Sequence, residues 1–239
     1  MIASMGSIAP QSSEDATQSA MQIDAFLQTH PVAISLRNDP DYTELRPHLK
    51  ITESARAHNF MTGALTGPQR ISVPPYVFSK ENGGGMVMIM HVGDNLCDQP
   101  GIVHNGLIAA LFDEGLARCC FAALPNKVGV TANLNIEHHQ PLMANSYIVL
   151  SAETTKLQGR KAWGYGQIET LPCDGKEMVL IAEARGLFIE PKQIAVSFTC
   201  QTELMHGANL DIFRYWETRI EVVERSIRDL SHITLQSSA

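Results

Sequence analysis

One long apolar stretch with an isolated acid in it limits the folds open to this chain more than any other feature. Residues 104–122 read as a loop that enters a helix with apolar residues on all sides. A helix without a polar face is normally buried, and a buried carboxylate costs several kcal/mol unless a partner compensates it. Glu114 has such a partner in Arg118, four residues later. Asp113 has none on its own helix face, so the sequence predicts a central buried helix whose second acid needs a separate explanation.

Asp113 has two interpretations. A neighbouring strand could satisfy it structurally, through Thr131 or Asn133, or it could be kept for chemistry as a general base. The start of the same helix adds a second component, because its unpaired N–H groups and positive dipole end suit an anion or a developing oxyanion. An acid and an oxyanion pole on one buried helix are the two groups that thioester hydrolysis needs.

Strand patterns surround the predicted helix. Pro74-Pro75 interrupts the first of them, which places it at an edge or a bulge, and residues 130–138 alternate between apolar and polar over nine positions. The expected strands cover 71–78, 86–92, 130–138, 147–155, 161–170 and 178–190. Short connections between strands favour an antiparallel sheet. We therefore expect an α+β fold in which an antiparallel sheet wraps around the helix of about 104–122.

The chain divides into four parts by composition. We expect a flexible tail over 1–20, a helical and irregular extension over 21–69, a central domain over 70–190 and a C-terminal extension over 191–239. The last part contains an apolar stripe at helical spacing between about 210 and 230. Its members are Phe213, Trp216, Ile220, Val223, Ile227 and Leu230. This stripe predicts an amphipathic helix that packs against the central domain or a second subunit.

Charge and hydropathy exclude two classes of partner. The formal net charge of −7 argues against nucleic acid or an anionic membrane surface as the main partner. No run of about 18 apolar residues exists, so we expect no transmembrane helix. An anionic substrate is still compatible with this charge, provided that basic residues gather locally around it.

The cysteines and the start of the chain bear on the compartment. The five cysteines are odd in number and show no C-x-x-C spacing, which argues against a disulfide framework and fits a reducing compartment. The first basic residue is Arg37, so the start of the sequence has neither the pattern of a signal peptide nor that of an Arg-rich transit peptide. These features predict a cytoplasmic protein.

Motifs for several other chemistries are absent from the sequence. There is no G-x-S-x-G nucleophile elbow, no P-loop and no complete dinucleotide fingerprint. Residues 137–139 (Glu-His-His) are weak as a metal site, because adjacent strand residues point to opposite faces. We expect neither a metal nor an organic cofactor.

Three blocks of the sequence resemble a known family. His104-Asn105-Gly106 followed by Asp113, the stretch 130–136 and the stretch 156–161 are similar to motifs of the hot-dog-fold acyl-CoA thioesterases. The likeness is strongest to the 4-hydroxybenzoyl-CoA and phenylacetate-pathway superfamily, including its eukaryotic thioesterase-superfamily-member branch. It spans about 70–190, roughly half of the chain, with the three motifs in the family's order.

The resemblance implies a role for each matching residue. Asp113 matches the general base or nucleophile, and His104 matches the residue that caps the helix entrance. The amide of Asn105, with that of Gly106, matches the oxyanion donor. Thr131 matches the hydroxyl that helps to hold the attacking water. The family usually has Gly where this chain has Asn105, a change that keeps the backbone N–H but puts substrate size in question.

The resemblance also implies where the substrate's carrier binds. Lys156, Arg160 and Lys161 match a hairpin that lies near the coenzyme A phosphates in relatives; an ordinary charged hairpin tip is the alternative. Asn105 and Asp113 are eight residues apart, roughly 12 Å along a helix at 1.5 Å per residue. One carbonyl cannot lie about 3 Å from both, so we expect a homo-oligomer, a dimer or tetramer, with shared active sites.

Three functional readings fit these motifs. The first is hydrolysis of an acyl-CoA or acyl-carrier-protein thioester. The others are a non-catalytic acyl-CoA-binding or regulatory protein and a hot-dog dehydratase or hydratase, since one fold hosts several functions. The presence of Asp113 and Thr131 favours hydrolysis.

Overall fold

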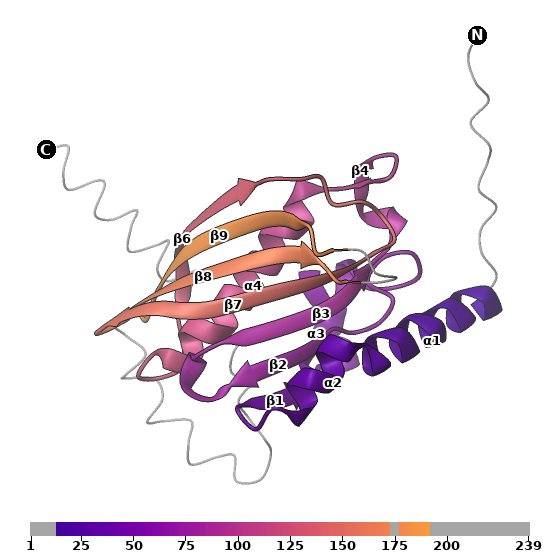
Figure 1. Ribbon diagram of the computed structural model, residues 1–239. Coiled ribbons are helices and arrows are strands. Elements are labelled where there is room, and N and C mark those ends of the chain that lie inside the picture. Colours follow the sequence, from indigo (N-terminus) through magenta and orange to yellow (C-terminus); the bar gives the residue numbers. More distant parts are fainter. Residues whose placement is uncertain (1–12, 173–176, 192–239) are drawn as a thin grey trace, which may run out of the picture.

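The computed structural model describes residues 13–172 and 177–191 as one antiparallel sheet around a long helix (Figure 1). The helix, α4, runs from Asn105 to Ala123. The sheet has seven strands in the order β1-β2-β3-β7-β8-β9-β6. Their bounds are β1 Tyr42–Leu45, β2 Tyr76–Lys80, β3 Met86–Val92, β6 Val130–His138, β7 Ser146–Gln158, β8 Lys161–Thr170 and β9 Leu180–Ile189. The predicted α+β hot-dog fold is confirmed.

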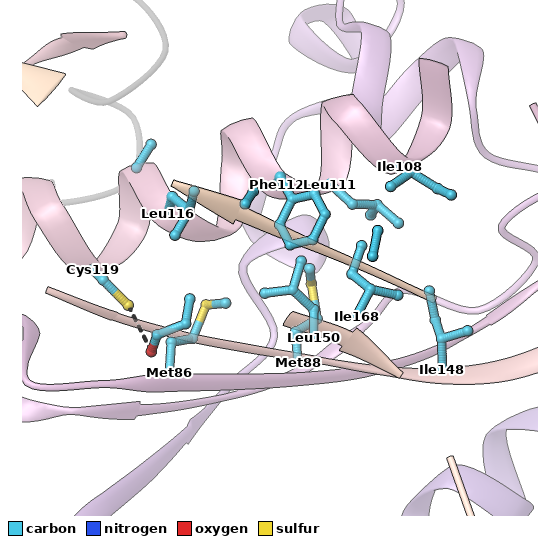
Figure 2. Packing of buried hydrophobic residues seen from close by; sticks show 14 of the residues in the cluster. Met86, Met88, Ile108, Leu111, Phe112, Leu116, Cys119, Ile148, Leu150 and Ile168 are labelled. Carbon is cyan, nitrogen blue, oxygen red and sulfur yellow. Dashed lines mark hydrogen bonds between the residues drawn. The ribbon is translucent and has the colours of Figure 1, made fainter. Parts of the chain in front are cut away.

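The main core lies between α4 and the concave face of the sheet. Figure 2 shows Ile108, Phe112 and Leu116 of α4 above Met88 of β3 and Leu150 of β7, all of them buried. This close packing restricts which residues α4 can carry on the side that faces the sheet. A Cβ atom added at Gly115 would lie 2.7 Å from Cδ2 of Leu150, so the helix could not approach the sheet as closely with a larger residue there.

The two adjacent cysteines of α4 belong to this core. Burial raises the pKa of Cys119 to about 12 and that of Cys120 to about 11. The Cys119 thiol donates to the carbonyl of Ala152 across 3.4 Å (Figure 2). Both are therefore inert apolar side chains rather than reactive thiols.

Two helices cover part of the opposite, convex face. α1 spans Ser13–Thr29 and α2 spans Pro31–Asn38. They pack on the side of the sheet formed by β1, β2 and β3 (Figure 1), through a second cluster of buried side chains. This cluster includes Ile23, Leu27, Phe78, Ile89 and Val149. α1 includes residues 13–20, which were expected to belong to a flexible tail, because Ala- and Gln-rich sequence with Glu14 and Asp15 in the first turn favours a helix.

Short elements connect the larger ones. Between β1 and β2 lie a 3₁₀ turn at Pro47–Lys50, α3 at Glu53–Arg56 and a π turn at Phe60–Ala64. Two further 3₁₀ turns span Glu81–Gly83 and Asp94–Leu96, and a small ribbon of β4 (Cys97–Gln99) and β5 (Ile102–Val103) leads into α4. The strand expected over 71–78 begins only at Tyr76, because a proline has no N–H for the sheet.

Among the described residues, β6 is an edge strand that pairs only with β9. Leu134 and Ile136 face the core, as the alternation predicted, while the intervening residues are exposed. A bulge between Thr131 and Asn133 changes the register of the pairing. No helix within the described ranges is long and apolar enough to cross a bilayer. The helix expected over 210–230 lies outside the described residues, and the four-part division of the chain stays a prediction.

Candidate active site

His104 caps α4 as expected. Its backbone is extended (φ −62°, ψ 129°), and its Nδ1 accepts a hydrogen bond of 2.8 Å from the Gly106 amide. The amide of Leu107 donates to the His104 carbonyl at 2.9 Å. Within the described residues, the first-turn amide of Asn105 has no acceptor. Of the two amides that the resemblance offered as oxyanion donors, the structure leaves that of Asn105 open and occupies that of Gly106.

Asp113 and Thr131 come together. The Thr131 hydroxyl donates to Oδ1 of Asp113 across 2.6 Å, and both residues are half-buried. Of the two partners considered for Asp113, the structure selects Thr131. Asn133 points away to the convex face, because the bulge that follows Thr131 places Asn133 opposite Leu187. This bond orients the carboxylate without burying it.

The side chain of Glu114 points away from α4 in another direction than that of Asp113 and is fully buried. Its Oε1 accepts from Arg118 Nε at 3.2 Å and from His48 Nε2 at 3.0 Å. Burial alone would raise the pKa of this carboxyl, but the Arg118 charge and the His48 contact outweigh burial and lower it to about 2. The Arg118 partner was predicted. His48 was not, because it lies 66 positions away in the chain and no local pattern links the two.

The charged hairpin lies beside the other end of α4. Thr154 contacts Cys120, and Asn126 binds the buried Glu190 at the end of β9. Arg160 donates to the Glu190 carbonyl at 2.6 Å, so its guanidinium closes the hairpin onto β9. The Lys156 ammonium lies 4.8 Å from the centre of the Trp163 ring.

Lys161, the third basic residue of the hairpin, is exposed. All three predicted residues therefore gather at one tip of the sheet, at the opposite end of α4 from Asn105.

One cluster could hold a metal ion. Glu137, His139 and Glu183 bring three ligand atoms within 4.8 Å of one another on the convex face. Adjacent strand residues do point apart, as argued, but Glu137 and His139 are two apart and share a face. The cluster is also an ordinary ion-pair group, since His139 lies 3.4 Å from Glu183 and Arg185 lies 3.9 Å from it.

Comparison with known proteins places this geometry in a family. An uncharacterized protein, named as mitochondrial, from Candida albicans is 36% identical over 158 residues, covering 66% of this chain and 71% of that protein. The family model described as thioesterase superfamily matches residues 100–165, which contain His104, Asp113, Thr131 and the hairpin. This chain belongs to the thioesterase superfamily. The predicted family is confirmed.

Two further matches are more distant. The mouse acyl-coenzyme A thioesterase THEM4 is 34% identical over 104 residues, which span 44% of this chain and 42% of THEM4. The crystal structure of zebrafish thioesterase superfamily member 2 matches with a TM-score of 0.42 and 22% identity, over 48% of this chain and 81% of that one.

The expected cytoplasmic location is wrong by these comparisons, because the Candida relative is named as a mitochondrial protein. Cysteines without a disulfide pattern indicate a reducing environment, a property that does not single out the cytosol. The absence of an Arg-rich start describes only the first residues of the sequence.

Proposed function

We propose that this protein hydrolyses an acyl thioester, carried by coenzyme A or by an acyl carrier protein, to a free acid and a thiol. The observation that carries the proposal is the pair of groups on α4. Asp113 is oriented by Thr131 at 2.6 Å and stays half-buried, and the Asn105 amide at the helix start has no acceptor among the described residues. These are a candidate base and a candidate oxyanion donor.

Asp113 activates the attacking group. As a general base it takes a proton from water while the hydroxide adds to the thioester carbonyl carbon. The tetrahedral intermediate then collapses, the C–S bond breaks, and the thiolate leaves and takes up the proton. As a nucleophile, Asp113 would instead form an acyl anhydride that water later opens. Both routes need an ionised carboxylate at this position.

Asn105 stabilises the oxyanion. Its amide lies in the first turn of α4, where the N–H groups and the helix dipole favour negative charge. One such donor is typically worth about 3 to 4 kcal/mol of transition-state stabilisation. The side chain of Asn105, in place of the family's usual Gly, borders the same site and would limit the size of the acyl group.

Each active site combines Asp113 of one subunit with Asn105 of another. Asn105 and Asp113 lie about 12 Å apart along α4, and the basic hairpin lies beside the far end of that helix. No strand of the described ranges pairs with the outer edge of β6, next to Thr131, so this edge offers backbone groups to a second chain. We therefore propose a homodimer, or a tetramer built from two such dimers, in which each of the two sites of a dimer takes Asp113 from one chain and Asn105 from the other. By the name of its relative, we place it in mitochondria.

The hairpin binds the carrier. Lys156 and Lys161 supply positive charge for the phosphates of coenzyme A or of a phosphopantetheine arm, while Arg160 holds the hairpin in place through Glu190. The local charge explains how a chain of net charge −7 can take an anionic substrate.

A thiol-release assay over a panel of acyl-CoAs and one acyl-carrier-protein thioester tests the proposal. Asp113→Asn keeps the volume and removes the charge, so the best rate should fall by at least about 10²-fold, the lower range for a positioned base. Glu137→Gln removes a carboxylate from the opposite face of β6 and should leave the rate unchanged. Binding of acyl-CoA without hydrolysis by the wild type would favour the binding-protein alternative, and hydration of an enoyl-CoA would favour the hydratase.

A further inference from the structure

The convex face of the sheet is covered on one half only. α1 and α2 pack over β2 and β3, and their cluster reaches Val149 of β7. Over β8, β9 and β6 the described residues contain no such cover (Figure 1). There the surface is hollowed by about 540 Å³.

The hollow has an apolar floor, and a cationic side chain lies over each of its two rings. Trp163 and Tyr165 of β8 and Leu187 of β9 line it, and each is half-buried. The Lys156 ammonium lies 4.8 Å from the Trp163 ring centre, and the Arg185 guanidinium lies 5.4 Å from that of Tyr165. Large apolar side chains gathered in one exposed hollow are typical of a surface that another segment covers.

The open part of the face has the width of one helix. From β7 through β8 and β9 to β6 the sheet spans about 14 Å, at about 4.8 Å per strand. A helix with its side chains is about 10–12 Å across. One helix would complete the layer that α1 and α2 begin.

The chain itself supplies such a segment. β9 ends at Ile189, two residues after Leu187, and Ile189 pairs with both β6 and β8 beside the hollow. Residues 192–239 follow, and the stretch up to Leu210 can reach back across the sheet at up to about 3.3 Å per residue. The stripe of Phe213, Trp216, Ile220, Val223, Ile227 and Leu230 is apolar. Glu217 and Glu224 lie along one side of it and are opposite in charge to Arg185.

We propose that residues 210–230 form a helix that docks its apolar stripe in the hollow lined by Trp163, Tyr165 and Leu187 of the same chain. Trp216 and Val223 face the rings, and Glu217 and Glu224 lie toward Arg185. The N-terminal and C-terminal extensions then cover the two halves of one sheet face. This proposal is independent of the chemistry proposed for Asp113.

The two tryptophans of the chain make the docking measurable in the full-length protein. Trp163 and Trp216 are the only ones, so Trp216→Phe leaves Trp163 as the single fluorophore. Its emission should be poorly quenched by acrylamide. Adding Val223→Asp puts a charge into the stripe and should raise the quenching constant several-fold. Thr218→Asp adds the same charge on the opposite side of the predicted helix and should leave the constant unchanged.

Equal quenching in all three proteins would overturn the proposal. If the shielding of Trp163 disappeared on dilution with the stripe intact, a second copy would be the occupant, and the proposal would again be wrong. A photo-cross-linking residue in place of Leu187 identifies the occupant directly. We expect cross-linked peptides from 210–230 of the same chain, shown by mixing isotopically light and heavy proteins. Cross-links between light and heavy chains would contradict docking within one chain.

Discussion

Asp113 and Glu114 are neighbours in the sequence and opposites in the structure. Glu114 is 1% exposed and is held by Arg118 and by His48 from a distant segment. Asp113 is half-buried and receives a hydroxyl hydrogen bond from Thr131. A buried acid held through its Oε1 by two partners holds the fold together, whereas an oriented acid that keeps access to solvent can exchange protons with a substrate or water. One residue of offset on α4 separates the structural side of the helix, with Glu114, from the side with Asp113 to which we assign the chemistry, called the chemical side below.

The largest expected effect lies on the structural side. Glu114→Gln leaves Arg118 without its buried counter-charge, and breaking such a pair typically costs about 3–5 kcal/mol. Urea unfolding at neutral pH measures it. Asp113→Asn should change the free energy of unfolding by less than about 1 kcal/mol, because the Asn side chain can still accept from Thr131. Equal losses in both variants would remove the distinction between the two acids.

The second effect is the pH dependence of the contribution that Glu114 makes to the free energy of unfolding. The pKa of Glu114 is about 2 in the folded protein, below its ordinary value in the unfolded chain, so the unfolded chain takes up the proton first as the pH falls. The stabilisation is complete above the unfolded pKa and is lost as the pH falls toward 2. The wild type should lose about 3 kcal/mol more than Glu114→Gln between pH 5 and pH 2. Parallel pH curves for the two proteins would contradict the pairing.

The third effect lies on the chemical side and is smaller. Thr131→Val keeps the shape of the side chain and removes one hydrogen bond to a charged group, worth about 1.5–3 kcal/mol. Thiol release should therefore fall by about tenfold or more. A companion change, Thr170→Val on β8, removes a hydroxyl that caps the Val179 amide instead and should leave turnover near the wild-type value. If both variants behaved alike, Thr131 would have no special link to Asp113.

The sequence predicted the parts of this molecule that local periodicity controls. The apolar run of 104–122 and the alternation of 130–138 appear as α4 and β6 almost to the residue. The Thr131 partner of Asp113 was one of two considered, because both alternatives lie on a strand expected beside the helix. The bulge between Thr131 and Asn133 determines which of the two faces Asp113. A bulge depends on how two strands pair, and the sequence of one strand does not show this.

Contacts between distant segments could not be predicted. The short β1 has four residues, too few to show a period, and His48 reaches Glu114 only because the turns after β1 fold against α4. Trp163 and Tyr165 are two residues apart and so share one face of β8, but alternation along a strand does not say which half of a sheet face a helix covers. The occupied state of the Gly106 amide likewise depends on the ring orientation of His104.

The shared site is the central claim, and mixed dimers test it most directly. Asp113→Ala removes the base. Asn105→Pro removes the amide proton at a first-turn position that tolerates proline, after a residue whose ψ of 129° suits a following proline. Each homodimer should be inactive. A mixed dimer carries both defects in one site and none in the other, so random reassortment should restore roughly a quarter of wild-type thiol release.

The matched control mixes Asp113→Ala with Thr131→Val. These two residues act from the same chain, so every site of the mixed dimer keeps one defect and activity should not rise above that of the parents. Differential tags verify that mixed dimers form. The account predicts recovery to about a quarter for the first pair and none for the second. No recovery in verified mixed dimers of the first pair would contradict the shared site and the role of Asp113 or Asn105 in it.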